Sequence, residues 1–379
     1  MSKETLHAPF RADVVGSFLR PEELKVARRE FAAGNISAKE LREVEDRLIK
    51  DLVEKQKKHG IHAFSDGEFR RAYWHLDFMW GLNNVEHIEL EHGYRFHGIE
   101  TAKGSIKLTG KIGGKNHPFV DDYRYVKQFE EEGFVARQTI PAPAQFLTEL
   151  FRGDNTENTR VYYPDDEELI NDIAKAYQQV IKDLYDAGCR NIQFDDCTWG
   201  MIVDDRYLQE KIKNWTSFED EAEKFLKVNN LALEGKPADL VISTHICRGN
   251  YNSCYASSGA YDRVAPYVFA QENVDAFYLE YDDERSGSFE ALKFIPKHKK
   301  VVLGLITTKR PELEDKDFIL ARIKEAATYF PIENLCLSPQ CGFASCEIGN
   351  RITEQEQWAK IDLVQKIADL AAWGCQYLV

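Results

Sequence analysis

The sequence predicts a (β/α)8 barrel, or TIM barrel, on the basis of two observations. Along the 379 residues, short runs rich in β-branched and aromatic residues alternate with longer amphipathic segments. This alternation is typical of a parallel sheet covered by helices, and eight strands are the number that closes such a barrel. Barrels of this length commonly form one unit, so residues 1–379 are expected to be a single domain. An open, doubly wound sheet is the main alternative.

Local patterns place the individual elements. The eight predicted strands are, in chain order, Asp13–Gly16, His62–Asp66, Phe134–Ile140, Asn191–Asp195, Leu240–His245, Ala276–Glu280, Val301–Ile306 and Leu335–Ser338. A helix is expected between Ser37 and Gly60, because Ser37 followed by Glu40 is a capping-box pattern and Gly60 is a typical helix stop. The further predicted helices are Asp166–Ala187, Phe218–Asn229, Asp317–Tyr329 and Glu354–Trp373.

One segment interrupts the alternation. From about residue 84 to 121 the sequence is strand-like and punctuated by glycines, which predicts an inserted β-hairpin or meander. The aromatic run just before it, AYWHLDFMWG (Ala72–Gly81), fits either a ligand pocket or the core.

The composition narrows the class of protein. A formal net charge of −14 disfavours a nucleic-acid partner, because contact with phosphates requires a basic surface. No stretch approaches the roughly 20 apolar residues of a membrane span, and the N-terminal MSKETLHAPF has no apolar signal region. The eight cysteines are therefore expected to be reduced thiols in a cytoplasmic protein.

Four residues with metal-ligand chemistry stand at or just after predicted strand ends: His245 and Cys247 in THIC, Glu280 in FYLEYD, and Cys341 in SPQCGF. His245 and Cys247 are two residues apart, so they project from the same face of a strand. Structural zinc sites usually draw ligands from CxxC pairs, which this chain lacks. Ligands from three separate strands indicate a catalytic Zn2+ site with one position open to a substrate.

Six segments together resemble the cobalamin-independent methionine synthase family, specifically its C-terminal catalytic barrel. They are VVGSFLRP (Val14–Pro21), DGEFRR (Asp66–Arg71), IQFDD (Ile192–Asp196), THIC, LEYD and SPQCG, in the order of the family. The resemblance runs over nearly the whole chain, which looks like a short form without the family's additional N-terminal barrel.

The resemblance implies a cytoplasmic methyltransferase of methionine biosynthesis that acts on homocysteine. It places the zinc ligands on the four residues named above. The residues that it implies for binding the amino and carboxylate groups of homocysteine are Gly16, Ser17, Glu68 and Asp195. Two carboxylates can neutralise an α-ammonium group, and backbone N–H groups with a hydroxyl can bind a carboxylate.

The methyl donor implied by the resemblance is a methylfolate, 5-methyltetrahydrofolate with or without a polyglutamate tail. A methyl-carrying partner protein is an alternative. Lys309 stands where the larger enzymes have a histidine that is thought to help protonate the departing folate nitrogen. The tryptophan that stacks on the pterin has no counterpart near Pro141–Leu147. Lys309 and Asp196 are therefore the candidate catalytic residues, beside an ordered water.

Two other functions fit the same residues. Zinc lowers the proton affinity of a bound thiol, so the site could alkylate a different thiol, such as one of the coenzyme M type. Such a thiol lacks an α-ammonium group, which makes Glu68 and Asp195 superfluous. The other alternative is a zinc-binding or thiol-binding barrel without catalytic activity.

Overall fold

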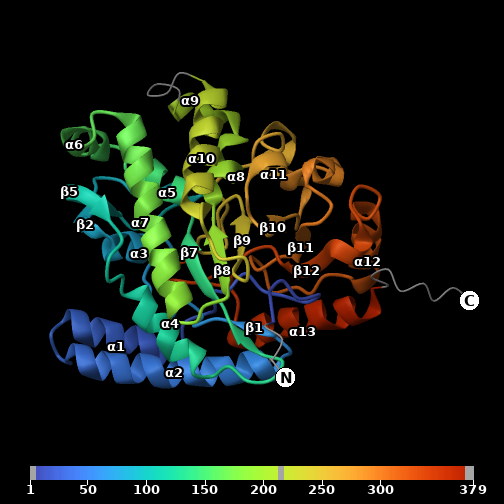
Figure 1. The fold of residues 1–379 in the computed structure, drawn as a ribbon. Helices are drawn as coiled ribbons and strands as arrows, with labels where there is room; N and C mark the ends of the chain where they lie inside the picture. Colours follow the sequence, from blue (N-terminus) through green and yellow to red (C-terminus); the bar gives the residue numbers. More distant parts are fainter. Residues whose placement is uncertain (1–5, 212–216, 372–379) are drawn as a thin grey trace, which may run out of the picture.

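The computed structural model describes residues 6–211 and 217–371. Its centre is a parallel sheet with the strand order β12-β11-β10-β9-β8-β7 (Figure 1). The strands are β7 (Gln138–Pro141), β8 (Asn191–Asp195), β9 (Val241–Ile246), β10 (Ala276–Glu280), β11 (Lys300–Ile306) and β12 (Leu335–Pro339). Neighbours in the sheet are neighbours in the sequence with a helical connection between them. The protein is therefore an α/β fold built on a parallel sheet.

A second parallel pair adjoins this sheet. Strand β1 (Ala63–Phe64) pairs with β6 (Val135–Ala136), and only Arg137 separates β6 from β7. The strand predicted over Phe134–Ile140 is thus split in two. A closed barrel would require one more strand between β12 and β1.

The strand prediction for Asp13–Gly16 is wrong, because Ala12 alone forms an isolated bridge, with Leu337. The carbonyl groups of this segment accept hydrogen bonds from side chains instead of from a strand ladder. The donor–acceptor pairs are Arg137 to Val14, Gln193 to Val15 and Ser65 to Gly16. Side chains therefore hold this segment beside the sheet, and closure of an eight-stranded barrel stays a prediction.

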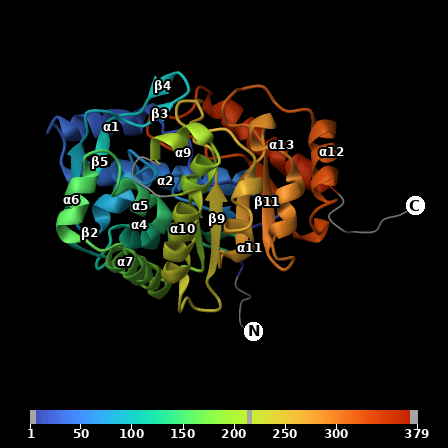
Figure 2. The ribbon, with the colours of Figure 1, turned by 90° about the horizontal axis from the view of Figure 1, so that it is seen from above.

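Helices cover the outside of the sheet, as Figure 2 shows. The α-helices of the described residues are α1 (Glu22–Ala32), α2 (Ala38–Lys58), α3 (Leu76–Gly81), α4 (Phe119–Lys127), α5 (Pro143–Glu149), α6 (Asn155–Tyr162), α7 (Asp166–Asp186), α8 (Cys197–Ile202), α9 (Asp205–Lys211), α10 (Phe218–Leu233), α11 (Val268–Gln271), α12 (Lys316–Ala326) and α13 (Glu354–Leu370). The capping box of Ser37 and Glu40 is confirmed at the start of α2. The predicted helix end at Trp373 lies outside the described residues.

The interrupting segment forms two antiparallel pairs. Strand β2 (Asn83–Glu89) pairs with β5 (Gly104–Gly113), and β3 (Arg95–Phe96) pairs with β4 (Ile99–Glu100). The strands end at Gly113, so the predicted range to residue 121 runs into α4. No helix in the described part of the chain has an apolar stretch that could cross a bilayer.

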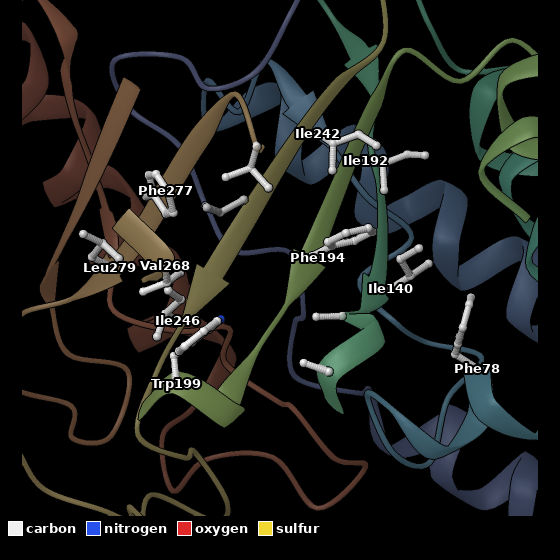
Figure 3. Close-up of a cluster of buried hydrophobic side chains, with 14 of the residues drawn as sticks. Phe78, Ile140, Ile192, Phe194, Trp199, Ile242, Ile246, Val268, Phe277 and Leu279 are labelled. Atoms are coloured by element: carbon white, nitrogen blue, oxygen red, sulfur yellow. The ribbon is translucent and has the colours of Figure 1, made fainter. Parts of the chain in front are cut away.

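Successive residues of the central strands point to opposite faces, which separates the core from the site. Figure 3 shows one face, where apolar side chains pack with Trp199 of α8 and Val268 of α11. The strand residues on this face are Ile140, Ile192, Phe194, Ile242, Ile246, Phe277 and Leu279, all at most 1% exposed. The alternate residues of the same strands include Asp195, His245 and Glu280, which therefore project from the other face.

A buried ionic group lies on that inner face. Arg137 lies 3.1 Å from the carboxylate of Asp13 and donates a hydrogen bond to the hydroxyl of Tyr278 at 2.9 Å. The hydroxyl of Tyr278 donates to the other oxygen of Asp13 at 3.0 Å. Tyr278 also packs with Val302 and Cys336. These contacts join the N-terminal segment to the strands that carry the site.

Candidate active site

A cavity opens where β8 and β9 end, with about 1030 Å3 of space free of protein atoms, open mouth included. The predicted site residues that line it are Ser17, Glu68, Asp195, His245, Cys247 and Cys341. The predicted residues that do not line it are Gly16, Asp196, Glu280 and Lys309.

Three of the four predicted metal ligands converge in this cavity. One ligand atom each from His245, Cys247 and Cys341 lies within 4.8 Å of the other two, and all three side chains are buried. The Nδ1 atom of His245 lies 3.3 Å from the carbonyl oxygen of Tyr278. That contact fixes the ring, as a hydrogen bond from the second nitrogen does in most metal-binding histidines. One imidazole and two thiolates are a donor set that Zn2+ prefers, so these residues fit the ion.

The fourth predicted ligand, Glu280, lies outside that group. Its Oε2 accepts a hydrogen bond from the backbone N–H of Arg248 at 2.7 Å. Its Oε1 lies 3.3 Å from Arg285 and 3.5 Å from Lys309. Burial opposes the charge on Lys309, but Asp282 and Glu280 outweigh that effect and raise the pKa of the ammonium group. Glu280 as a zinc ligand and Lys309 as a catalytic residue both stay predictions.

A further thiol touches one of the three converging side chains, Cys247. The Sγ atom of Cys197, the first residue of α8, lies 3.3 Å from the Sγ atom of Cys247. Hydrogen bonds from the thiols of Cys197 and Cys341 lower the pKa of Cys247 well below its usual value. The close approach of α8 depends on Gly200, because a Cβ there would lie 1.9 Å from the carbonyl oxygen of Cys247.

Two carboxyl groups face the same cavity. Burial raises the pKa of Asp195 to about 8, an effect that His245 opposes and Glu68 reinforces. Burial also raises the pKa of Glu68, against the positive charge of Arg71. The Oε1 atom of Glu68 lies 3.2 Å from Arg71 and accepts a hydrogen bond from Thr139 at 2.9 Å, while its Oε2 is buried without a partner in the described residues. A bound cation would offset the cost of burying both groups.

The backbone at Glu68 is strained. Its φ of +61° is in the left-handed region, directly after Gly67 at +68°. Non-glycine residues adopt such angles at a cost of about 1–3 kcal/mol, and these angles cluster at functional sites. The turn aims the carboxyl group of Glu68 into the cavity.

The position of Ser17 depends on a glycine on the opposite wall. A Cβ at Gly342 would lie 1.9 Å from the Oγ atom of Ser17, so only glycine allows this approach. The hydroxyl of Ser17 also accepts a hydrogen bond from the backbone N–H of Ala344 at 3.4 Å. Gly16 has a φ of +136° and turns the chain toward the site without lining it.

Asp196 points away from the cavity. One carboxylate oxygen caps α8 by accepting hydrogen bonds from the backbone N–H and the hydroxyl of Thr198. The other accepts a hydrogen bond from Asn229 at 2.9 Å. These contacts show that Asp196 caps α8 and joins it to α10, and they do not support a role in proton transfer.

Sequence reasoning missed one wall of the cavity. Tyr94, Arg95, Phe96 and Thr101, all from the inserted segment, line it beside Tyr73 and His75 of the aromatic run. That run divides, because Phe78 and Met79 are buried in the core. The aromatic residues and glycines of the inserted hairpin could have suggested a ligand-binding surface. The sequence alone could not show that this surface faces the cavity, because that contact depends on the tertiary fold.

Several polar atoms of His75 and of α5 face the cavity and lack partners in the described residues. Both ring nitrogens of His75 are buried without a hydrogen-bond partner in the described residues, as are the Oε1 of Gln145 and the Oγ1 of Thr148. All three side chains line the cavity. Burial lowers the pKa of His75 to about 3, so its imidazole is neutral. Unpaired buried groups cost about 1–3 kcal/mol each, which a polar ligand would recover.

Comparison with known proteins agrees with the resemblance seen in the sequence. The family model described as "Cobalamin-independent synthase, Catalytic domain" matches residues 136–363. The chain is 44% identical to the uncharacterized protein YxjH of Bacillus subtilis, over 96% of this chain and 94% of YxjH. It is 25% identical to a methionine synthase of Saccharolobus solfataricus, over 87% of this chain and 86% of that enzyme.

A solved structure supports the same assignment. A crystal structure from Listeria monocytogenes, described as a candidate vitamin-B12-independent methionine synthase, is similar with a TM-score of 0.76 and 39% identity. The alignment covers 96% of this chain and 98% of that one. The chain belongs to the cobalamin-independent methionine synthase family and matches the family's catalytic domain.

Proposed function

We propose that the protein is a zinc-dependent S-methyltransferase that converts homocysteine to methionine. The observation that carries this proposal is the convergence of two different sets of side chains in one cavity. His245, Cys247 and Cys341 supply a metal-binding set, and Glu68 and Asp195 supply two carboxyl groups. A free amino acid with a thiol side chain matches both sets at once.

The metal-binding residues would hold Zn2+, which when bound stabilises the thiolate form of a substrate thiol. The chain keeps His245 oriented through Tyr278 and excludes bulk water from the two cysteines by burying them. Glu280 is the proposed fourth ligand. Arg285 and Lys309 would receive its carboxylate when the substrate takes its place, because they already contact it.

The amino-acid part of homocysteine would bind on the other side of the cavity. We expect the α-ammonium group between Glu68 and Asp195, where a positive charge offsets the burial of two carboxyl groups. The hydroxyl of Ser17 would contact the α-carboxylate, beside the backbone turn at Gly16. The distance between these groups and the cysteines is bridged by the flexible side chain of the substrate.

The methyl donor would occupy the region of the cavity that is lined by the inserted segment, the aromatic run and α5. Aromatic rings and the unpaired polar atoms of His75, Gln145 and Thr148 suit a planar, hydrogen-bonding group such as the ring system of a methylfolate. This proposal assigns no proton donor, because neither Asp196 nor Lys309 lines the cavity. We also propose that the whole chain forms one closed (β/α)8 barrel, with the β insertion as part of it.

The test has two parts. Purified protein should contain one zinc ion per chain by elemental analysis, and zinc-loaded protein should form methionine from homocysteine with 5-methyltetrahydrofolate or its triglutamate form. Protein that remains active without zinc would contradict the proposal. Zinc-loaded protein that binds homocysteine yet forms no methionine with these donors or a methyl-carrying protein would favour the non-catalytic alternative. Activity with a coenzyme M-type thiol instead of homocysteine would favour the alkyltransferase alternative.

A further inference from the structure

We propose that Cys197 and Cys247 form an oxidant-sensitive modification site, at which a peroxide converts the two thiols into a disulfide. Cys197 is not one of the proposed zinc ligands, yet its Sγ atom lies 3.3 Å from that of Cys247. The disulfide would withdraw Cys247 from the metal-binding set. Only this consequence for the metal rests on the proposed function, because the disulfide itself requires the two thiols and the peroxide but no metal.

The backbone brings the two cysteines to matching positions. In the parallel pairing of β8 with β9, Asp195 is opposite His245, and the N–H of Asp196 donates to the carbonyl of His245 at 2.8 Å. Cys197 and Cys247 each follow this pair by two residues. Neighbouring strands are about 4.8 Å apart, and the Cα atoms of disulfide-bonded cysteines are usually about 4.4–6.8 Å apart. The register therefore suits a disulfide without a change of fold.

The sulfur atoms need only a small movement. Their separation of 3.3 Å must fall to about 2.05 Å, which rotation of the two side chains can supply. The contact of Gly200 with the carbonyl of Cys247 already holds the first turn of α8 against this segment. Both thiols line the cavity, so a small oxidant reaches them along the route of the substrate.

The reaction balances with hydrogen peroxide as the oxidant. One thiol attacks a peroxide oxygen, which gives a sulfenic acid and releases one water molecule. The second thiol then attacks this sulfur, forms the S–S bond and displaces the hydroxyl group as a second water molecule. Two thiols and one peroxide thus yield one disulfide and two waters. Without the second thiol, further peroxide would carry the sulfenic acid to a sulfinic acid, which thiol reductants do not reverse.

Cys341 is the competing partner, since its Sγ atom belongs to the same group of ligand atoms as that of Cys247. Peptide mapping without reduction separates the two cases. Zinc-loaded and metal-free full-length protein would be treated with hydrogen peroxide, digested and analysed by mass spectrometry. We expect a cross-linked peptide pair containing Cys197 and Cys247, lower in mass by two hydrogen atoms, and its loss after dithiothreitol.

Two variants complete the test. In Cys197→Ser the cross-link between positions 197 and 247 should disappear, and any cross-link that Cys247 still forms should lead to Cys341. Cys336→Ser is the matched control, since Cys336 is buried with Tyr278 and Val302 and does not line the cavity. It should behave as the wild type. A wild-type cross-link from Cys247 to Cys341 instead of to Cys197, or no cross-link at all, would overturn the proposal. A protein that forms the disulfide but binds no zinc would refute the proposed function alone.

Discussion

Replacing Asp195 with asparagine should weaken homocysteine binding while leaving the metal site intact. The amide has nearly the shape of the carboxyl group but cannot carry the negative charge that an α-ammonium group needs. Asp195 lines the cavity, is 8% exposed, and shares it with Glu68. Within the described residues, its Oδ1 atom accepts one long hydrogen bond, from the side chain of Gln193 at 3.5 Å. The substitution therefore breaks no strong contact of the free protein.

The magnitude follows from the kind of contact that is lost. A hydrogen bond to a charged group contributes about 1.5–3 kcal/mol, which corresponds to a rise of roughly 10–150-fold in the KM or Kd for homocysteine. Glu68 remains in place, so binding should not vanish. Zinc content should stay at the wild-type level, because Asp195 is not a proposed ligand.

Titration calorimetry of zinc-loaded protein with homocysteine, together with elemental analysis, measures both quantities. Asp196→Asn is the matched control, because it makes the same change one residue away on a side chain that caps α8. The control should lower thermal stability and leave the Kd for homocysteine within about twofold of the wild type. Equal losses of affinity in both variants, or none in Asp195→Asn, would refute the proposed binding of the ammonium group.

Three further outcomes are expected. Cys341→Ala should lose its zinc during dialysis against a chelator that leaves the wild type loaded, and full retention of metal would show that the ligand set is wrong. His75→Phe should raise the KM for the methyl donor but not the Kd for homocysteine. Its melting temperature should not fall, because the substitution removes two buried ring nitrogens that have no hydrogen-bond partner in the described residues. Asp13→Asn should lower the free energy of unfolding by about 3–5 kcal/mol in urea titrations, because Arg137 is left buried without its counter-charge. A loss below about 1 kcal/mol would mean that the hydroxyl of Tyr278 and the carbonyl of Val14 satisfy Arg137 without the carboxylate.

The strands that carry the site could be predicted almost to the residue. The bounds of β8 and β10 agree with the sequence prediction. Strand β8 alternates polar and apolar residues, β10 is mostly apolar, and each ends at an acidic residue, Asp195 or Glu280. The period of two within these strands then places the polar side chains on the inner face. Local information was sufficient at these positions.

Other features depend on residues that are remote in the sequence. The segment Asp13–Gly16 has the composition of a strand, but side chains as distant as Arg137 and Gln193 occupy its carbonyl groups. The contact of Lys309 with Glu280 likewise joins the end of β10 to the loop after β11. Periodicity along the chain contains no information about such pairs.

Three consecutive residues at the junction of β8 and α8 show how one short segment serves different purposes. Asp195 ends the strand and faces the cavity, Asp196 turns outward and caps the helix, and Cys197 begins the helix against Cys247. The alternation of a strand separates the first two side chains, and the helical start returns the third to the inner side. Substitutions at adjacent positions should therefore affect different quantities: substrate affinity at Asp195, stability at Asp196, and the response to peroxide at Cys197. If all three substitutions changed the same quantity, this division of roles among the three residues would be wrong.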